Sequence, residues 1–131
     1  MNETTRKVDS IDIPFVTDEN LIGTWVYADF VKHSDDFMPE VQRWPGQSAF
    51  DRMIFYERGS IGAISDNGEF LRSALMWTNG FIISEPDRTC AAYEIREIDG
   101  NTYLFFEWKS GDYIYRMMEP WIYVFKKEEM A

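Results

Sequence analysis

The 131-residue sequence has one cysteine, Cys90, and one histidine, His33. A single cysteine cannot form a disulfide within the chain, and a lone histidine has no companions with which to complete a metal site. No run approaches the roughly 20 apolar residues of a membrane span, and residues 1–12 lack the apolar core of a signal peptide. The sequence therefore predicts a cytoplasmic protein with no membrane insertion, no metal and no cofactor.

Basic residues are also scarce, because 13 Lys and Arg stand against 23 Asp and Glu, for a net charge of −10. Such a surface repels nucleic acid and anionic bilayers, so we expect no nucleic-acid partner. Aromatic residues are abundant at 17 %, and the hydrophobic fraction of 45 % is ordinary for a globular protein. The composition predicts one folded domain with many rings to bury.

Short turn signals divide the chain after residue 20 into segments rich in aromatic and β-branched residues, the pattern of consecutive hairpins. Such a meander either stacks as a sandwich or closes into a barrel, and closure is favoured because it removes exposed edges. We therefore predict an all-β fold, an up-and-down antiparallel barrel of about eight strands. The predicted strands span residues 21–32, 49–58, 61–65, 69–77, 81–84, 89–98, 102–109 and 113–127, the last broken near 119–120.

The predicted domain organisation is simple. Residues 16–127 form the barrel, residues 1–15 a flexible leader, and residues 128–131 a charged tail. The leader carries one apolar patch, which we expect to plug or brace the closed end of the barrel. Its residues are Ile11, Ile13, Pro14 and Phe15. The one long connection, residues 33–48, is expected to act as a lid over one mouth.

Two stretches resemble known barrels. The run Leu21-Ile22-Gly23-Thr24-Trp25 resembles the Gly-x-Trp start of the first strand of calycins, the superfamily of lipocalins and fatty-acid-binding proteins. The second half is similar to a lipocalin-like domain of Gram-positive bacteria, which also occurs appended to membrane metallopeptidases of the penicillin-sensor type. The residues that carry this likeness are 93–95, 99–100, 103–113 and Arg116, and the likeness extends over about 13–127.

The resemblance implies a calycin-like barrel that binds a small ligand, and it carries over no catalytic residue. It implies no protease activity either, because the chain has no His-Glu-x-x-His. In lipocalins a basic residue from the end of the barrel packs across the Gly-x-Trp tryptophan. For Trp25, that residue is Arg116, Lys126 or Lys127.

Alternation along residues 102–109 leaves two arrangements open, because both faces of this strand are bulky. If Tyr103, Phe105 and Glu107 point inward, they form an aromatic cavity with one carboxylate. If Leu104, Phe106 and Trp108 point inward, the interior is apolar and filled.

The candidate ligand-binding residues combine aromatic walls with a few polar groups, as small-molecule sites do. An inward arginine requires Glu107, Asp29 or an anionic ligand as its partner, whereas outward arginines would pair with surface glutamates. Mid-strand arginines are Arg52, Arg72 and Arg116. The candidates are Trp25, Tyr27, Arg72, Tyr93, Tyr103, Phe105, Glu107, Tyr115, Arg116 and Tyr123.

Three functions remain. The leading one is a non-enzymatic module that holds a small, partly apolar molecule in the barrel. The alternative is a filled barrel that docks on a protein partner through the tryptophans Trp44, Trp77 and Trp121. The third is an enzyme with acid–base groups in a barrel pocket. No nucleophile elbow or phosphate loop supports the third, and Cys90 is expected to be a small buried residue.

Overall fold

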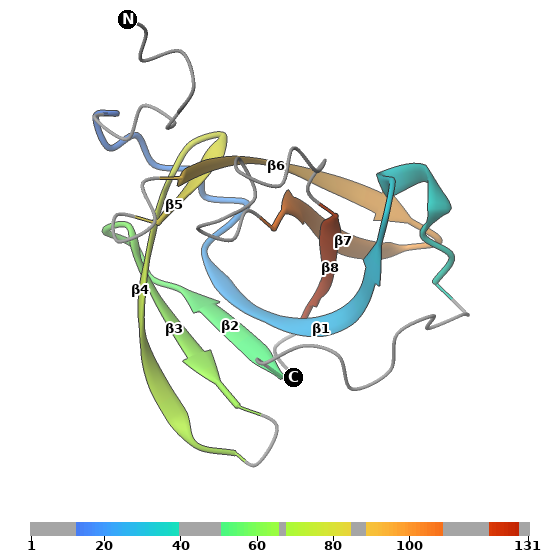
Figure 1. Cartoon of the computed structure of the whole chain (residues 1–131), viewed down its shortest axis with the longest axis horizontal. Helices are drawn as coiled ribbons and strands as arrows, with labels where there is room; N and C mark the ends of the chain where they lie inside the picture. The colour runs from blue at the N-terminus through green and yellow to red at the C-terminus, as the bar shows by residue number, and fades with distance from the viewer. Residues whose placement is uncertain (1–12, 40–50, 66–67, 85–88, 109–120, 129–131) are drawn as a thin grey trace, which may run out of the picture.

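The computed structural model describes residues 13–39, 51–65, 68–84, 89–108 and 121–128, and for residues 71–74 the backbone alone. Its strands close into an eight-stranded barrel in which β1 also pairs with β8 (Figure 1). All neighbours are antiparallel, so the predicted all-β, up-and-down barrel is confirmed. The strands are β1 (Gly23–Val31), β2 (Arg52–Phe55), β3 (Ser60–Ile64), β4 (Phe70–Thr78), β5 (Phe81–Ser84), β6 (Thr89–Ile98), β7 (Asn101–Glu107) and β8 (Ile122–Lys127).

The connection after β1 begins with a short 3-10 helix, η2 (Ser34–Asp36), which the sequence did not predict. Residues 40–48 of this connection, on which the expected lid depends, lie outside the described residues. So do residues 113–120 of the predicted last strand. Within the described segments, no helix is long and apolar enough to cross a membrane.

The β6–β7 hairpin shows how local sequence sets the strand order. Ile98 pairs with Asn101, so Asp99 and Gly100 alone form the loop. Their φ angles are 52° and 84°, and a type I′ turn requires positive values at both positions. Asp-Gly suits this turn because glycine has no Cβ and aspartate tolerates the left-handed region. The turn makes β6 and β7 antiparallel neighbours.

One buried cluster draws side chains from seven of the eight strands, with β6 packed against it, and forms the barrel interior. Its members alternate along each strand, as inward-facing positions must. Burying one large apolar side chain contributes about 1.5–3 kcal/mol, so this cluster is the main source of stability. Its buried members are Leu21, Trp25, Met53, Phe55, Ile61, Trp77, Ile82, Leu104, Phe106, Tyr123 and Phe125, and Tyr93 and Ile95 of β6 pack against them.

A second buried cluster lies on the outer face of β7 and β8, and it consists of Val31, Phe37, Tyr103, Phe105 and Val124. The Phe37 ring, which follows η2, meets Tyr103 and Phe105 edge-on at centroid distances of 4.9 and 5.6 Å. The inward arrangement of Tyr103, Phe105 and Glu107 is therefore wrong. Instead β7 directs Leu104 and Phe106 into the barrel, and Trp108, which follows β7, packs against the same interior cluster.

Arg96 on β6 fastens η2 to this outer face. Its guanidinium lies 4.9 Å from the centre of the Phe105 ring. It also donates to Ser34 Oγ at 3.2 Å and pairs with Asp35 at 3.4 Å. Because η2 and Phe37 cover this face, β7 is apolar on both sides.

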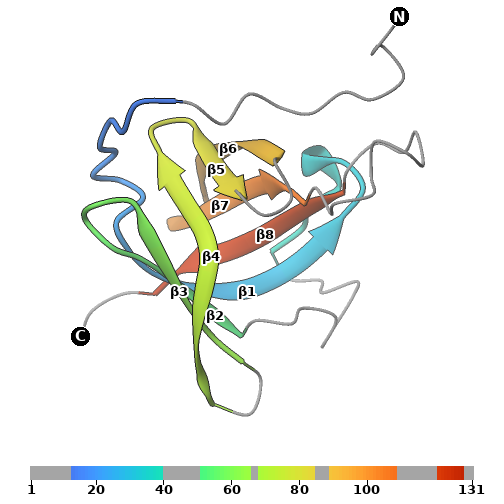
Figure 2. The ribbon, with the colours of Figure 1, turned by 60° about the vertical axis from the view of Figure 1, so that its left-hand side comes forward.

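The segment before β1 braces one end of the barrel, as its apolar residues predicted. The rings of Phe15 and Trp77 meet edge-on with centroids 5.2 Å apart. The Val16 N–H donates to Thr78 Oγ1 at 2.7 Å, and the Val16 carbonyl accepts from the Asn79 N–H at 2.8 Å. Figures 1 and 2 show this blue segment beside the β4–β5 hairpin. Ile11 lies outside the described residues.

Gly59→Ala is expected to destabilise the protein more than Gly80→Ala. Both glycines have positive φ, 95° and 94°, so each alanine costs about 1–2 kcal/mol of backbone strain. At Gly59 a Cβ would also lie 3.0 Å from the Trp77 carbonyl oxygen and 3.1 Å from Phe15 Cδ1, whereas at Gly80 it meets nothing within 4 Å. We expect Gly59→Ala to lose at least about 1 kcal/mol more in urea unfolding. If both variants lost the same free energy of unfolding, Phe15 and the Trp77 carbonyl would move away from the new Cβ at Gly59 without destabilising the protein.

Candidate functional site

Aromatic rings fill the centre of the barrel. Phe106 and Phe125 stack with centroids 5.9 Å apart, and Tyr123 lies 5.7 Å from Phe106. Tyr27 meets Tyr123 and Phe125 edge-on at 6.1 and 5.9 Å. Such pairs add about 0.5–1.5 kcal/mol each beyond the area they bury. The interior thus follows the filled arrangement, and any binding space must lie beside these rings.

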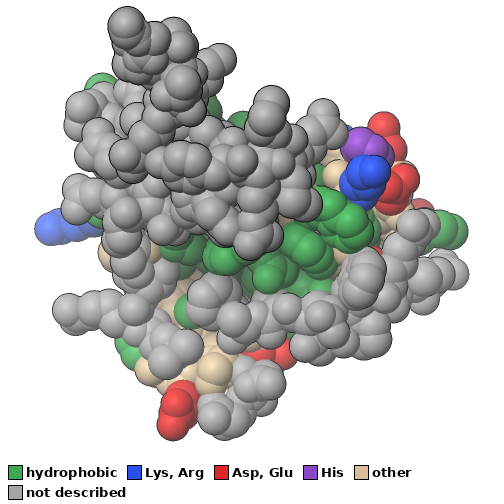
Figure 3. Space-filling model, viewed as in Figure 1, with side chains coloured by type: hydrophobic (Ala, Val, Ile, Leu, Met, Phe, Trp, Pro, Cys, Tyr) green, Lys and Arg blue, Asp and Glu red, His purple; other side chains and the backbone are tan. Residues whose placement is uncertain are grey.

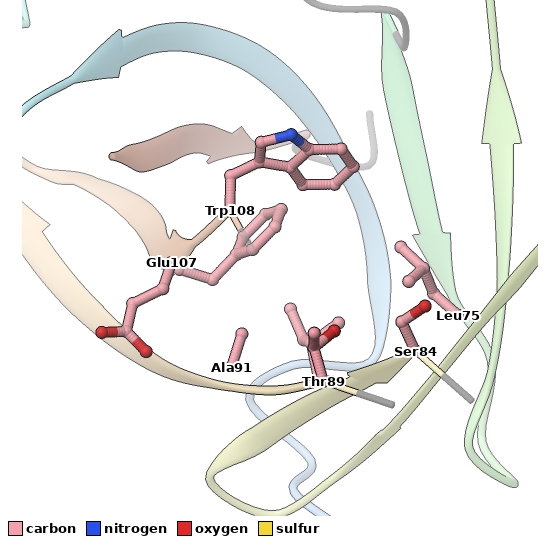
Figure 4. Close-up of a pocket in the computed structure, with 8 residues that line it drawn as sticks. Leu75, Ser84, Thr89, Ala91, Glu107 and Trp108 are labelled. Carbon is pink, nitrogen blue, oxygen red and sulfur yellow. The ribbon is translucent and has the colours of Figure 1, made fainter. Parts of the chain in front are cut away.

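A cavity of about 30 Å³ lies between the wall of β4, β5 and β6 and the end of β7 (Figure 4). About 10–15 Å³ holds one water molecule, so the space suits two groups of that size. Whole drug-sized ligands occupy roughly 300–1,000 Å³, which limits this cavity to the end of a ligand. Its lining residues are Leu75, Ile82, Ser84, Thr89, Ala91, Phe106, Glu107 and Trp108.

The strand register brings two hydroxyl groups together in this cavity. Ser84 is the register partner of Leu75 on β4 and of Thr89 on β6. Ser84 is 8 % exposed and Thr89 is 4 % exposed. Figure 4 shows both side chains, with Ala91, directed from their strands toward the cavity. Two nearly buried hydroxyls set in apolar walls can fix the orientation of a small polar group.

Glu107 lies at the edge of the cavity, where the β6–β7 ladder ends. The last pair of that ladder joins Tyr93 to Phe106. One residue further, Glu107 Oε1 accepts a hydrogen bond from the Ala92 N–H at 3.3 Å. Figure 4 shows the carboxylate directed away from Leu75 and Ser84. The Glu107 carboxylate therefore accepts a hydrogen bond at the edge of β6, and the polar groups inside the cavity are the hydroxyls of Ser84 and Thr89.

Further aromatic side chains continue from the cavity toward the surface. The Trp108 ring meets Tyr123 edge-on at 5.1 Å, and Phe30 lies 4.6 Å from Tyr123. Phe30 in turn stacks on Trp121 at 5.4 Å. On the face of the molecule shown in Figure 3, hydrophobic side chains gather over β7 and β8. A ligand whose end occupies the cavity would meet apolar surface along the rest of its length.

Two interior tyrosines are held as neutral phenols. Burial first, and then the nearby Asp29 carboxylate, raise the pKa of Tyr27 to about 12. Burial and the hydrogen bond to Asp18 raise the pKa of Tyr93. That bond runs from the Tyr93 hydroxyl to Asp18 Oδ2 at 2.5 Å. At neutral pH both groups are hydrogen-bond donors and poor proton acceptors.

The predicted ligand-binding residues do not gather at this cavity. Glu107 lines it, whereas Trp25, Tyr27, Tyr93 and Tyr123 belong to the ring-filled interior or pack against it. Tyr103 and Phe105 lie on the opposite face of β7, beneath Phe37. The side chain of Arg72 lies outside the part of the chain that the structure describes, and so do Tyr115 and Arg116. Ligand binding by these residues stays a prediction.

Sequence reasoning missed the hydroxyl pair. Ser84 ends the predicted strand 81–84 and Thr89 begins the predicted strand 89–98, and a hairpin places such end residues opposite each other. That spacing was the available signal. The sequence did not show that this pair faces inward.

The described charged residues have different surroundings, because Asp29 is 0 % exposed whereas Arg52 lies at the surface. Arg52 pairs with Asp51 and with Glu128, each at 3.0 Å, so the outward alternative for this arginine is correct. The partner of Trp25 is Lys127, whose Nζ lies 5.3 Å from the ring centre, as the lipocalin resemblance led us to expect of a basic residue at the barrel end. Among the described residues, no three His, Cys, Asp or Glu side chains approach closely enough to hold a metal ion.

The tryptophans proposed for protein docking have different environments. Trp77 is 2 % exposed, so its assignment as an exposed docking residue is wrong. It is buried because it belongs to the barrel interior, where Phe15 meets its ring edge-on and its Nε1–H donates to the Tyr56 carbonyl at 2.9 Å. Trp121 is half-buried, and Trp44 lies outside the described residues. Cys90 is half-buried on β6.

No family model matches the chain, and neither a curated protein nor a solved structure matches it. The calycin likeness therefore rests on the sequence motifs and on the eight-stranded barrel itself.

Proposed function

We propose that the protein is a lipocalin-like, non-enzymatic binding module that takes one end of a small, partly apolar molecule into the cavity beside Trp108. The observation that carries this proposal is the pair of nearly buried hydroxyls, Ser84 and Thr89, inside an otherwise apolar cavity. Burial would supply the affinity and the hydroxyls the orientation. The described lining has one carboxyl group, Glu107, which faces away, and this arrangement favours binding over acid–base chemistry.

Native mass spectrometry of the protein purified from its own host tests this proposal. We expect a small molecule to co-purify with the wild-type protein and to be released on denaturation. Ala91→Leu should abolish its retention, because Ala91 lines the cavity and is 5 % exposed. Ala92→Leu is the matched control, because the neighbouring Ala92 is exposed on the other face of β6. Thermal unfolding verifies that both variants fold.

Two results would contradict the proposal. Retention of the molecule by folded Ala91→Leu would place the ligand elsewhere. A wild-type protein that carries no ligand would count against tight binding in the cavity and would favour the filled barrel as a docking module.

One observation supports that second function. Phe70 and Tyr56 are 59 % and 42 % exposed, and both lie close to Gly62 on the outer face of the barrel. Exposed rings gathered in this way are typical of surfaces that contact other proteins. The partner-docking alternative would therefore use these rings, because Trp77 is buried.

A further inference from the structure

Residues 14–16, here called the strap, lie against the end of β4 and are bound there through their backbone (Figure 2). The Val16 N–H donates to Thr78 Oγ1 at 2.7 Å, and the Thr78 hydroxyl donates to the Pro14 carbonyl at 3.1 Å. The Val16 carbonyl accepts from the Asn79 N–H at 2.8 Å. Such contacts hold a peptide by its backbone and leave its selectivity to side chains, as when a protein binds an added strand.

The Phe15 side chain supplies that selectivity. Its ring meets Trp77 edge-on with centroids 5.2 Å apart. The ring has room because residue 59 is glycine, where a Cβ would lie 3.1 Å from Phe15 Cδ1. Thr78, which supplies the hydroxyl, is 2 % exposed. Gly59 and the end of β4 therefore form a built site for a peptide with a central aromatic ring.

The strap itself is bound weakly at its outer side. Phe15 is 47 % exposed and Val16 is 53 % exposed, so the strap buries little apolar surface. Segments with few buried apolar contacts open locally at low free energy. The next attachment of the chain is Asp18, whose carboxylate accepts from the Tyr93 hydroxyl, and the intervening Thr17 is exposed. The strap can therefore detach at Thr17 while Asp18 and the barrel stay in place.

We propose that this site binds a peptide segment of a partner protein, with an aromatic residue between a proline and a β-branched residue, and that the strap occupies the site when the partner is absent. The strap shows which sequence the site accepts. The Thr78 hydroxyl favours an occupant, because a nearly buried polar group without a hydrogen bond is costly. The net charge of −10 opposes the approach of a second copy, so a different protein is the better partner.

This inference goes beyond the proposed function, because the site shares no residue with the described lining of the cavity. The test compares two neighbouring substitutions in the full-length protein. Phe15→Asp should release the strap, because aspartate cannot replace the ring contact with Trp77. Val16→Asp is the matched control and should leave the strap bound, because the Val16 side chain is 53 % exposed.

The probe is a synthetic peptide of residues 13–17, acetylated and amidated at its ends. NMR signals of the Thr78 amide and the Trp77 indole N–H report its binding. We expect it to bind Phe15→Asp at least about tenfold more tightly than the wild-type protein or Val16→Asp, because in those two the strap competes at an effective concentration of about 1 mM. The same peptide with alanine in place of Phe15 should bind Phe15→Asp at least about tenfold more weakly.

Hydrogen exchange of the wild-type protein gives a second measurement, which does not depend on a variant that folds. The Asn79 N–H is bonded to the strap, whereas the Trp77 N–H donates to the Gly59 carbonyl within the barrel at 2.8 Å. If the strap opens by itself, the Asn79 amide should be protected at least about tenfold less than the Trp77 amide.

Three results would overturn the proposal. The first is a peptide that binds Phe15→Asp no more tightly than the wild-type protein, or equally well without its aromatic ring. The second is equal protection of the two amides, because the strap would then open only with the barrel. The third is a wild-type dimer that dissociates when the peptide is added, which would make a second copy the occupant in place of a separate partner.

Discussion

Replacing Trp25 by alanine is expected to lower the free energy of unfolding by about 3–5 kcal/mol. Trp25 is 0 % exposed, and its Nε1–H donates to the Leu21 carbonyl at 2.8 Å. The substitution removes a large buried ring and leaves that carbonyl without its donor. Because a domain is stable by only about 5–15 kcal/mol, much of the total would be lost. Urea denaturation followed by far-UV circular dichroism measures the change.

Lys127→Met provides the control for Trp25. It keeps an unbranched apolar chain over the indole and removes the ammonium group, which also donates to the Asn20 carbonyl at 3.1 Å. We expect a loss of about 0.5–1 kcal/mol, as for an exposed cation–π contact. If Trp25→Ala cost no more than Lys127→Met, the indole would not be a central part of the interior.

Replacing Phe106 by alanine is expected to have the second large effect, a loss of about 3–5 kcal/mol. Phe106 is 2 % exposed, stacks on Phe125 and lines the cavity, so its removal joins a new void to the existing space. An apolar void of ring size binds benzene. We therefore expect benzene to raise the Tm of Phe106→Ala and to leave that of the wild-type protein unchanged.

The neighbouring residue offers a matched control for Phe106. Phe105 is 3 % exposed but lies on the outer face of β7, beneath Phe37. Phe105→Ala should also destabilise, yet benzene should not raise its Tm, because η2 and its following residues can settle into the vacated space. The reverse result, with benzene stabilising only Phe105→Ala, would mean that the faces of β7 are assigned the wrong way round.

Much of the fold could be predicted because its signals are local. The residue types Asp99-Gly100 by themselves favour a two-residue hairpin turn with positive φ angles. Asn79-Gly80 also favours a hairpin turn, and it forms a two-residue loop between Thr78 and Phe81. Short turns force sequential strands to be neighbours, and closure follows from the need to remove edges. The lipocalin resemblance limits the basic partner of Trp25 to Arg116, Lys126 or Lys127. The register between β1 and β8 places Lys127 opposite Trp25.

The candidate site could not be predicted in the same way. Along β7, Tyr103 and Phe105 are as apolar as Leu104 and Phe106, so alternation gave no preferred face. The choice was made by Phe37, which comes from a distant part of the sequence and covers the outer face. The cavity arises where the β6–β7 ladder stops at Phe106, a consequence of register around the whole barrel.

The sequence by itself determined the class of fold and the number and order of the strands, because each depends on residues that are close in the chain. Only the tertiary structure decided that rings fill the interior, that Trp77 is buried beneath Phe15, and that Ser84 and Thr89 meet in a small cavity. These features depend on barrel closure and on side chains contributed by distant segments. Neither strand periodicity nor turn chemistry specifies them.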